Sequence, residues 1–205
     1  RLEVRVHIVT GAVTSAQNII RSCHRAGLDV SDIVLESLAS SKAVLTGEER
    51  EIGVALVDLG GGTTDLAIFA NDSIKHTAVL ALGGTNLTND IAFGLRTPMA
   101  SAEKIKIKYG CALAEMVPKD DVIEVMSVGG REPRRLSRQV LAEICEPRVE
   151  EMLALVDQEL IRSGMKNQIG AGVVLTGGTA LIEGIQELGE QIFNLPTRIG
   201  YPDKV

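Results

Sequence analysis

Apolar residues recur along this chain at two spacings, and each spacing predicts a different kind of secondary structure. Arg1 to Val9 alternates polar and apolar positions, which predicts a half-buried strand, and Ile33 to Leu35 predicts a short strand. Ala39 to Leu45 predicts a helix. An earlier helix ending at Gly27 is predicted by a stripe of residues three or four positions apart, namely Ala16, Ile19, Ile20 and Cys23.

The longest apolar segments come next, and a run of glycines separates the first two of them. Ile52 to Val57 predicts a buried strand, Leu66 to Phe69 a second, and Ser73 to Leu80 a third after the turn signal Asn71-Asp72. The glycines therefore join two strands. A P-loop or a dinucleotide fingerprint would open a helix instead, and no Gly-Lys pair occurs anywhere in the chain.

This first glycine loop, Asp58-Leu-Gly-Gly-Gly-Thr-Thr-Asp65, has the composition of a phosphate site. Residues without a Cβ let backbone amides converge closely on phosphate oxygens. Asp58 at the strand end could hold Mg²⁺ through water or orient an attacking water. An ordinary glycine-rich hairpin turn is the alternative. The candidate phosphate-binding residues are Asp58, Gly60, Gly61, Gly62, Thr63, Thr64 and Asp65.

A second glycine loop, Gly177-Gly-Thr-Ala180, follows the short apolar strand Gly172 to Thr176. Apolar residues then continue at helical spacing from Leu181 to Ile192, which would place the glycines at a helix N-terminus. Such an end offers unpaired N–H groups and a partial positive charge, with room for a flat nucleotide. A tight strand-to-helix turn, as in any α/β protein, is the alternative.

A long amphipathic helix is predicted from Val140 to Leu160, ending near Gly164. Pro147 cannot donate to the preceding turn, so we expect the helix to be kinked or to restart there. Cys23, Cys111 and Cys145 lie far apart and the histidines are scattered, which supports neither a disulfide framework nor a zinc site.

The charge balance argues against a nucleic-acid partner. The net charge is -6, so the general positive field of a nucleic-acid protein is missing, and the arginines between Arg131 and Arg138 form only a local cluster. Hydrophobic residues make up 45% of the chain, yet no apolar run of about 18 residues occurs, so neither a transmembrane helix nor a signal peptide is predicted.

The two glycine loops, in their order and spacing, resemble the ATPase fold shared by actin, sugar kinases and DnaK-type chaperones. Four further segments are similar to the bacterial cell-division family FtsA: Arg1 to Ala12, Leu82 to Ile91, Thr97 to Gly110 and Gly129 to Arg138. The resemblance implies an α/β chain of the actin-like, ribonuclease-H-like ATPase fold. It would hold the end of subdomains 1C and 1A (1–50), subdomain 2A in two parts (51–89 and 166–205) and subdomain 2B (90–165).

The same resemblance implies roles for side chains outside the glycine loops, and implies ATP and Mg²⁺ as cofactors. Glu103 and Lys106 would clamp the adenosine together with Gly177, Gly178, Thr179 and Ala180 of the second loop. Residues three apart share a helix face, although a solvated charge pair has the same spacing. Glu36 would position the hydrolytic water beside Asp58, and is otherwise a helix-start acid of the kind that the helix dipole favours.

The function that the resemblance implies is that of an ATP-binding protein with at most slow ATPase activity. It would polymerise by self-association, link FtsZ filaments to the cytoplasmic membrane at the division septum, and recruit other division proteins. We expect the chain to be part of a protein of about twice this length, cytoplasmic and peripheral on the membrane through a C-terminal helix outside this sequence. Arg131 to Glu151 is the candidate docking surface for the FtsZ peptide, and the alternative, which exposed ion pairs favour, is that its arginines and glutamates form a solvated charged face. The alternatives are another actin-fold protein, of the MreB or PilM type, or a sugar or acetate kinase.

Overall fold

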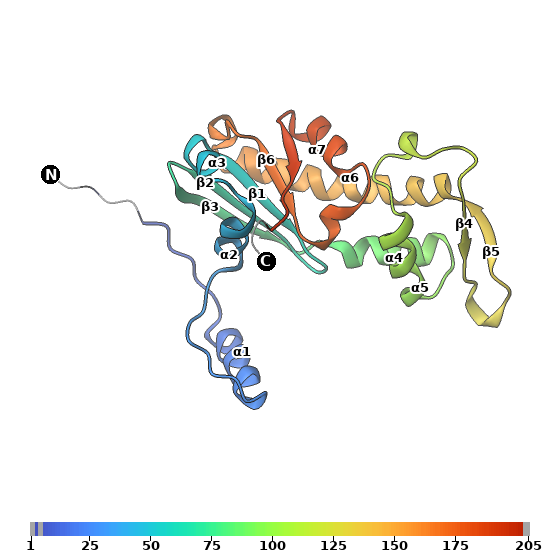
Figure 1. Cartoon of the computed structure of the whole chain (residues 1–205), viewed down its shortest axis with the longest axis horizontal. Helices are drawn as coiled ribbons and strands as arrows, with labels where there is room; N and C mark the ends of the chain where they lie inside the picture. Colours follow the sequence, from blue (N-terminus) through green and yellow to red (C-terminus); the bar gives the residue numbers. More distant parts are fainter. Residues whose placement is uncertain (1–2, 4–5, 203–205) are drawn as a thin grey trace.

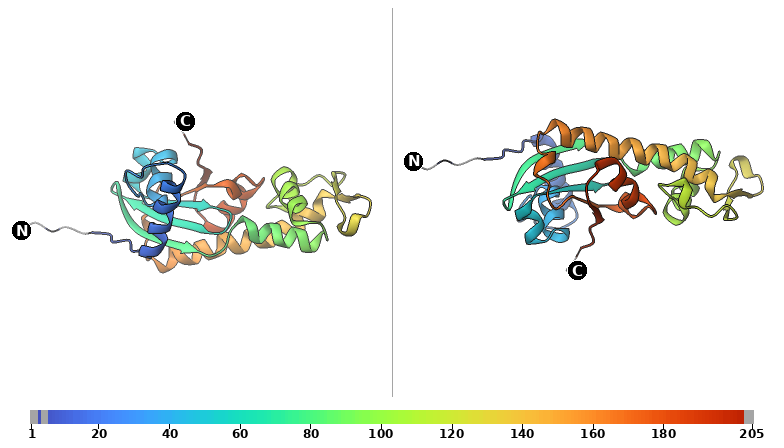
Figure 2. Two further views of the ribbon diagram at one scale, coloured as in Figure 1. Left: turned by 90° about the horizontal axis from the view of Figure 1, so that it is seen from below. Right: turned by 90° about the horizontal axis from the view of Figure 1, so that it is seen from above.

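The computed structural model describes residue 3 and residues 6–202. The molecule is elongated, with a mixed sheet and its covering helices at one end, and smaller helices with a two-stranded hairpin at the other (Figure 1). A single long helix, α6 (Arg138–Arg162), runs along both parts (Figure 2). Within the described residues, no helix is long and apolar enough to cross a membrane.

The sheet contains the strands predicted around both glycine loops. β1 (Val54–Leu59), β2 (Thr64–Ala70) and β3 (Ser73–Leu80) form antiparallel neighbours, while β6 (Val173–Thr176) and β7 (Thr197–Ile199) extend the other side in parallel. The order is β3-β2-β1-β6-β7. Because β1 and β6 are parallel neighbours, both glycine loops leave the same edge of the sheet.

Both faces of the sheet are buried, and alternate residues of β1 point to opposite faces. Ala55 and Val57 join the larger core, which includes side chains of α6 and of α7 (Ile185–Phe193). Val54 and Leu56 join a smaller core with Val44 of α2 (Glu36–Val44). Full burial of a side chain such as Leu56 contributes about 1.5 to 3 kcal/mol, so a sheet covered on two faces provides a rigid base for its loops.

A short helix, α3 (Gly47–Ile52), leads into β1 and begins with a capping box. The Thr46 hydroxyl accepts from the Glu49 amide at 3.2 Å, and the Glu49 carboxylate accepts from the Thr46 amide at 2.8 Å. Gly53 then turns the chain at a φ of 113°. A Cβ there would lie 2.0 Å from the Gln168 carbonyl oxygen, so only glycine allows this close entry into the sheet.

The other end of the molecule consists of short elements packed on α6. Helices α4 (Gly84–Gly94) and α5 (Met99–Tyr109) precede β4 (Val122–Val125), which pairs antiparallel with β5 (Arg134–Ser137). Single 3-10 turns complete the connections, at Ala114–Met116, Val128–Gly130, Lys166–Gln168 and Gly178–Leu181. Helix α4 crosses residues 89 and 90, where the sequence predicted a subdomain boundary.

Helix α6 is continuous through Pro147, so the predicted restart is wrong. The buried side chains Leu141 and Cys145 before the proline and Val149 and Met152 after it all pack in the same core. This shared burial outweighs the loss of one backbone hydrogen bond.

The N-terminal segment corrects two predicted strands. Helix α1 (Val13–Arg25) forms as expected, but none of its residues is buried and it projects away from the sheet (Figure 1). The strand predicted at 1–9 lies partly outside the described residues, and over Val6–Val9 the chain is not a strand. Ile33 to Leu35 is not a strand either. A strand is stable only when a neighbour pairs with it, and neither segment has such a neighbour among the described residues.

Candidate functional site

The first glycine loop is held by backbone hydrogen bonds to the start of α4. The Gly60 carbonyl accepts from the Gly84 amide at 2.9 Å, and the Gly61 carbonyl accepts from the Thr85 amide at 2.7 Å. The peptide bonds here are trans, so each following amide points opposite to its carbonyl. The N–H groups of Gly61 and Gly62 therefore point away from α4, on the exposed side of the loop.

A second pair of glycines, Gly83-Gly84, makes this close approach possible. A Cβ on Gly83 would lie 2.7 Å from the Gly61 carbonyl oxygen, and one on Gly84 would lie 2.5 Å from Oγ1 of Thr179. Sequence reasoning gave these two glycines no role in the site. The signal available was the Gly-Gly pair directly before a predicted helix, in a segment used only for the resemblance.

The second glycine loop approaches the first from β6. The Thr179 hydroxyl donates to the Gly60 carbonyl at 3.0 Å. Gly177 has a φ of 87°, and a Cβ there would lie 2.5 Å from Oδ1 of Asp58. The loop does not open an α-helix, which corrects the prediction: Gly178–Leu181 is one 3-10 turn, and α7 begins only after Gly184, whose left-handed conformation interrupts the helical pattern.

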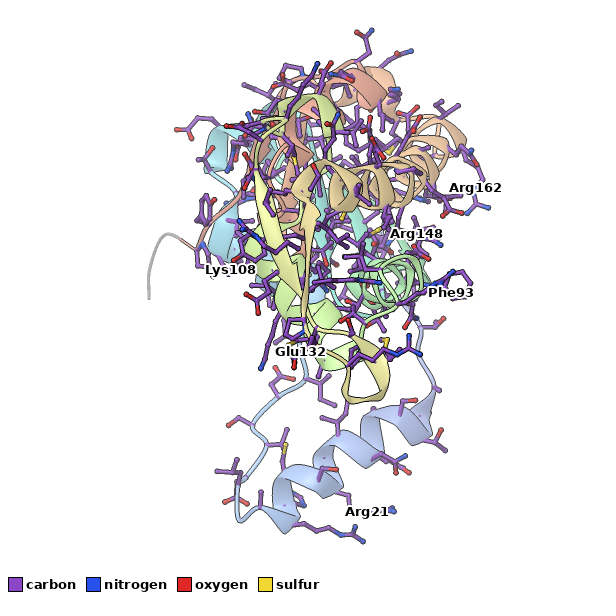
Figure 3. All side chains as sticks on the ribbon, turned by 90° about the vertical axis from the view of Figure 1, so that its right-hand side faces the viewer. Arg21, Phe93, Lys108, Glu132, Arg148 and Arg162 are labelled. Carbon is purple, nitrogen blue, oxygen red and sulfur yellow. The ribbon has the colours of Figure 1, made fainter. Side chains whose placement is uncertain are left out.

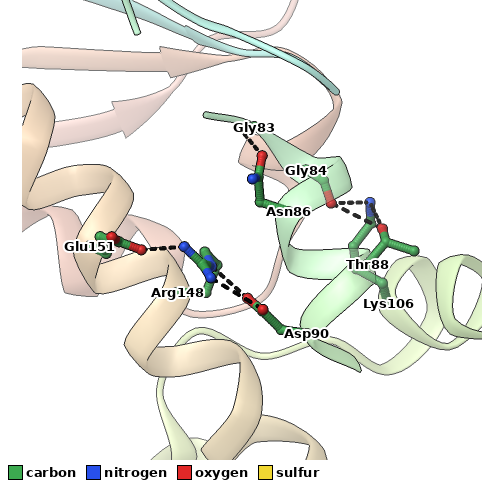
Figure 4. A network of polar contacts seen from close by, with 8 residues as sticks. All are labelled: Gly83, Gly84, Asn86, Thr88, Asp90, Lys106, Arg148 and Glu151. Carbon is green, nitrogen blue, oxygen red and sulfur yellow. Dashed lines mark hydrogen bonds and ion pairs between the residues drawn. The ribbon is translucent and has the colours of Figure 1, made fainter. Parts of the chain in front are cut away.

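The predicted clamp residues lie on one face of α5 and contact α4. Nζ of Lys106 is 2.8 Å from a carboxylate oxygen of Glu103. It also donates to the Gly84 carbonyl at 3.1 Å and to the Thr88 hydroxyl at 2.9 Å (Figure 4). Lys106 is buried, which its several acceptors make possible.

Glu103 remains ionised at neutral pH although it is partly buried. Burial by itself would raise the pKa of Glu103, but hydrogen bonds to Lys106 and Thr88 outweigh it and lower the pKa below 4.5. The carboxylate is therefore a charged acceptor at the edge of α5, within reach of polar groups of a ligand.

A cavity of about 380 Å³ opens where these segments meet, which is a volume typical of small-molecule sites. The sequence predicted five of its lining residues: Gly61, Glu103, Lys106, Gly178 and Thr179. It missed three aliphatic ones, Ile107, Leu181 and Ile182. Ile107 and Leu181 are exposed, and neither the strand nor the helix pattern distinguishes an exposed apolar residue at a ligand site from an ordinary surface one.

Three other acidic residues with predicted roles, Glu36, Asp58 and Asp65, lie on the α2 face of the sheet and do not line the cavity. Asp58 and Asp65 are direct cross-strand partners in β1 and β2. The Ser40 hydroxyl of α2 donates to Asp58 at 2.9 Å, and the Thr63 hydroxyl donates to Asp65 at 3.0 Å. Glu36 begins α2, and partial burial, followed by the charges of Asp65 and Asp58, raises its pKa.

No hydrogen bond or ion pair joins Glu36 to Asp58 or Asp65 among the described residues, and its predicted role in water positioning stays a prediction. Among the residues that the structure describes, no group of three or more His, Cys, Asp or Glu side chains is arranged to hold a metal ion directly. Thr64 and Ala180 are buried, and the Thr64 hydroxyl donates to the Leu82 carbonyl at 2.8 Å, so both support the loops from beneath.

The mixed sheet, with two glycine loops at the ends of β1 and β6, belongs to the actin-like ATPase fold, as the match to solved MreB structures shows. The structure of MreB 5 of Spiroplasma citri bound to AMPPNP matches with a TM-score of 0.75 and 22% identity. The match covers 92% of this chain and 60% of that one, and at this identity it shows the fold alone.

A family model described as "Cell division protein FtsA" matches residues 55–205, and the chain belongs to this family. The cell division protein FtsA of Pseudomonas aeruginosa is 56% identical over 205 residues, covering 100% of this chain and 49% of the relative. That of Escherichia coli is 44% identical over 209 residues, covering 98% and 50%. The chain thus spans about half the length of the curated relatives it matches.

Proposed function

We propose that this chain forms one side of the ATP-binding cleft of an actin-like cell-division protein. The observation that carries the proposal is the cavity in which Gly61, Glu103 and Thr179 meet from three separate segments. MreB 5, which shares the fold, was solved bound to AMPPNP, and that supports a nucleotide as the ligand.

Different residues at the cavity suit different parts of ATP. The amides of Gly61 and Gly62 point to the exposed side of the first glycine loop, where they would donate to phosphate oxygens. Glu103 would accept from ribose hydroxyls, with Lys106 holding the carboxylate in place. The aliphatic side chains of Ile107 and Leu181 would pack against the flat base.

Asp58 is the proposed ligand of Mg²⁺, through water, and Glu36 the residue that orients the hydrolytic water. Two carboxylates directly opposite each other on neighbouring strands repel, as Asp58 and Asp65 do, and a divalent cation would offset that repulsion. Mg²⁺ would neutralise phosphate charge during slow hydrolysis. Partial burial and then the charges of Asp65 and Asp58 raise the pKa of Glu36, which would favour a neutral carboxyl there in the absence of a cation.

Replacing Gly61 by valine tests the ATP site. A Cβ at this position would meet only Oγ1 of Thr85, at 3.8 Å, so Gly61→Val fits the fold while its branched side chain fills the cavity. We expect the full-length variant to lose at least about 2 kcal/mol of ATP binding, the scale of lost charge-assisted hydrogen bonds, measured by calorimetric titration with Mg²⁺. Gly47→Ala, at a glycine with no atom within 4 Å, is the control. Wild-type affinity in Gly61→Val would remove the proposal.

The cellular role that family membership supports is cell division. We propose that the full-length protein is cytoplasmic, self-associates into filaments, links FtsZ filaments to the inner face of the membrane at the septum and recruits other division proteins. Its membrane helix would lie outside this sequence. Bacterial two-hybrid or pelleting assays of the full-length protein with FtsZ test this role, and a failure to co-pellet at low salt would contradict it.

Within the expected docking segment, Arg148 is a better candidate for peptide contact than Arg134 or Arg138, because its side chain is more exposed than that of Arg138. Arg134 donates to the Leu95 carbonyl, and Arg138 is held by Asp121 and Glu183. Arg148 instead pairs with Asp90 and Glu151 beside an open hollow of about 250 Å³ (Figure 4).

Phe93, 88% exposed, lies on the same side of the molecule as Arg148 (Figure 3). Arginine and exposed aromatic side chains on one side of a protein are typical of a recognition surface. We expect Arg148→Glu to weaken binding of an FtsZ C-terminal peptide about tenfold or more at low salt. Arg162→Glu, on the same helix, is the control for added negative charge. Equal losses in the two variants would assign the effect to general charge.

A further inference from the structure

Arg138, the first residue of α6, connects three segments that are distant in sequence. Its Nε donates to the carbonyl of Tyr109 at 2.9 Å, and one terminal nitrogen donates to Asp121 at 3.2 Å. The other terminal nitrogen donates to Glu183. The side chain is only 14% exposed, so these contacts replace water almost completely.

The position is an unfavourable one for a cation. The N-terminus of a helix carries a partial positive charge, and α6 is 25 residues long with no acidic residue in its first turn. Burial also opposes the charge of Arg138, but Glu183 and Asp121 outweigh it and raise the pKa of the guanidinium. The arginine is therefore held there by its particular partners.

Two of those partners lie next to residues that line the cavity from two different segments. Tyr109 ends α5, two residues after the lining residue Ile107, and Glu183 directly follows the lining residue Ile182. The backbone repeats the connection, because the Ala112 amide donates to the Glu183 carbonyl at 2.7 Å. One guanidinium thus bridges the α5 wall and the wall formed by the second glycine loop.

The third connection leads to the two-stranded hairpin. Arg138 directly follows Ser137, the last residue of β5, and its own amide donates to the carbonyl of Asp121 next to β4. The residues that fix the cavity walls therefore also fix the base of the β4–β5 hairpin, which lies at the far end of the molecule from the sheet (Figure 1).

We propose that Arg138 is a positioning residue that sets the spacing of the two cavity walls and couples nucleotide binding to the β4–β5 hairpin. The inference rests on the proposed ATP site and goes beyond it. Because coupling between two sites is reciprocal, a nucleotide that orders the walls also orders the hairpin, and loosening the bridge weakens the nucleotide.

Glu183→Gln in the full-length protein is the sharpest test, since Glu183 is half exposed and the substitution keeps its shape. We expect ATP affinity to fall about fivefold to tenfold, within the usual range of coupling between sites. We expect Arg138→Lys to lower ATP affinity by a similar factor. The double variant should lose no more affinity than either single variant, because both substitutions break the same contact. Asp157→Asn is the matched control: it breaks the 2.5 Å pair with Lys166 near the other end of α6.

Hydrogen exchange provides a second readout that a purely structural bridge would not affect. ATP should slow amide exchange in 122–125 and 134–137 of the wild type, and should not do so in Glu183→Gln. Wild-type affinity in Glu183→Gln, or ATP-dependent protection that survives the substitution, would overturn the inference while leaving the ATP site intact. No ATP binding by the wild type would instead contradict the proposed function.

Discussion

The two walls of the cavity are built by different means. The glycine wall is held by main-chain groups: the Gly60 and Gly61 carbonyls accept from Gly84 and Thr85, with no charge involved. The α5 wall is held by side-chain charge, through Glu103 and Lys106. Steric changes should therefore break the first wall, whereas loss of the Glu103 or Lys106 charge should act mainly on the second.

The largest effect is expected from Gly177→Ala in the glycine wall. Gly177 has φ 87° and ψ 169°, a conformation essentially restricted to glycine, and the added methyl would meet Asp58 and the Leu59 carbonyl. We expect unfolding free energy to fall by about 1 to 3 kcal/mol in urea denaturation, together with loss of ATP binding. Gly178→Ala, with no atom within 4 Å, should unfold like wild type, and equal costs in the two variants would refute the steric explanation.

An intermediate effect is expected from Lys106→Ala in the charged wall. The substitution leaves the Gly84 carbonyl without this donor and frees Glu103 from its ion pair. ATP binding should weaken by about 1 to 2 kcal/mol in calorimetric titration. Lys108→Ala is the control, because Lys108 lies over the Tyr109 ring, 4.9 Å from its centroid, and does not line the cavity. A similar loss in Lys108→Ala would indicate a general charge effect.

The smallest effect is expected on stability, from loss of the Glu103 charge. The pKa of Glu103 is lowered in the folded protein, so its contribution to stability is complete above about pH 4.5 and is lost as pH falls through the lowered pKa. Glu103→Gln should therefore lower the free energy of unfolding at pH 7, where the contribution of Glu103 is complete, and flatten its pH dependence below about pH 4.5. The Glu103 carboxylate is 45% exposed, so the difference in unfolding free energy between variant and wild type should be small. If the two proteins do not differ, solvent screens the ion pair.

The sequence was sufficient for β1 to β3 and β6, because their apolar runs are bounded by turns, and β1 to β3 also pair with strands next to them in the chain. The sequence wrongly predicted strands at 6–9 and at Ile33 to Leu35. Both segments have the apolar pattern of a strand, but neither pairs with another strand among the described residues. The delayed start of α7 was also missed, since hydrophobic spacing cannot reveal the left-handed Gly184 that interrupts it.

Gly61, Gly178 and Thr179 of the cavity could be predicted because the glycine loops are visible in the sequence, whereas Glu103 and Lys106 were predicted from the family resemblance. Ile107 and Leu181 could not, since their importance arises only when α5 and the second glycine loop come together. The three glycines of the first loop do not have positive φ angles, so no special backbone conformation requires glycine at these positions.

The most direct test of the account is an experimental structure of the full-length protein with AMPPNP and Mg²⁺. We expect the phosphates at the Gly61 and Gly62 amides, the ribose at Glu103, and the base between Ile107 and Leu181. A nucleotide bound elsewhere, with this cavity empty at saturating concentration, would contradict it.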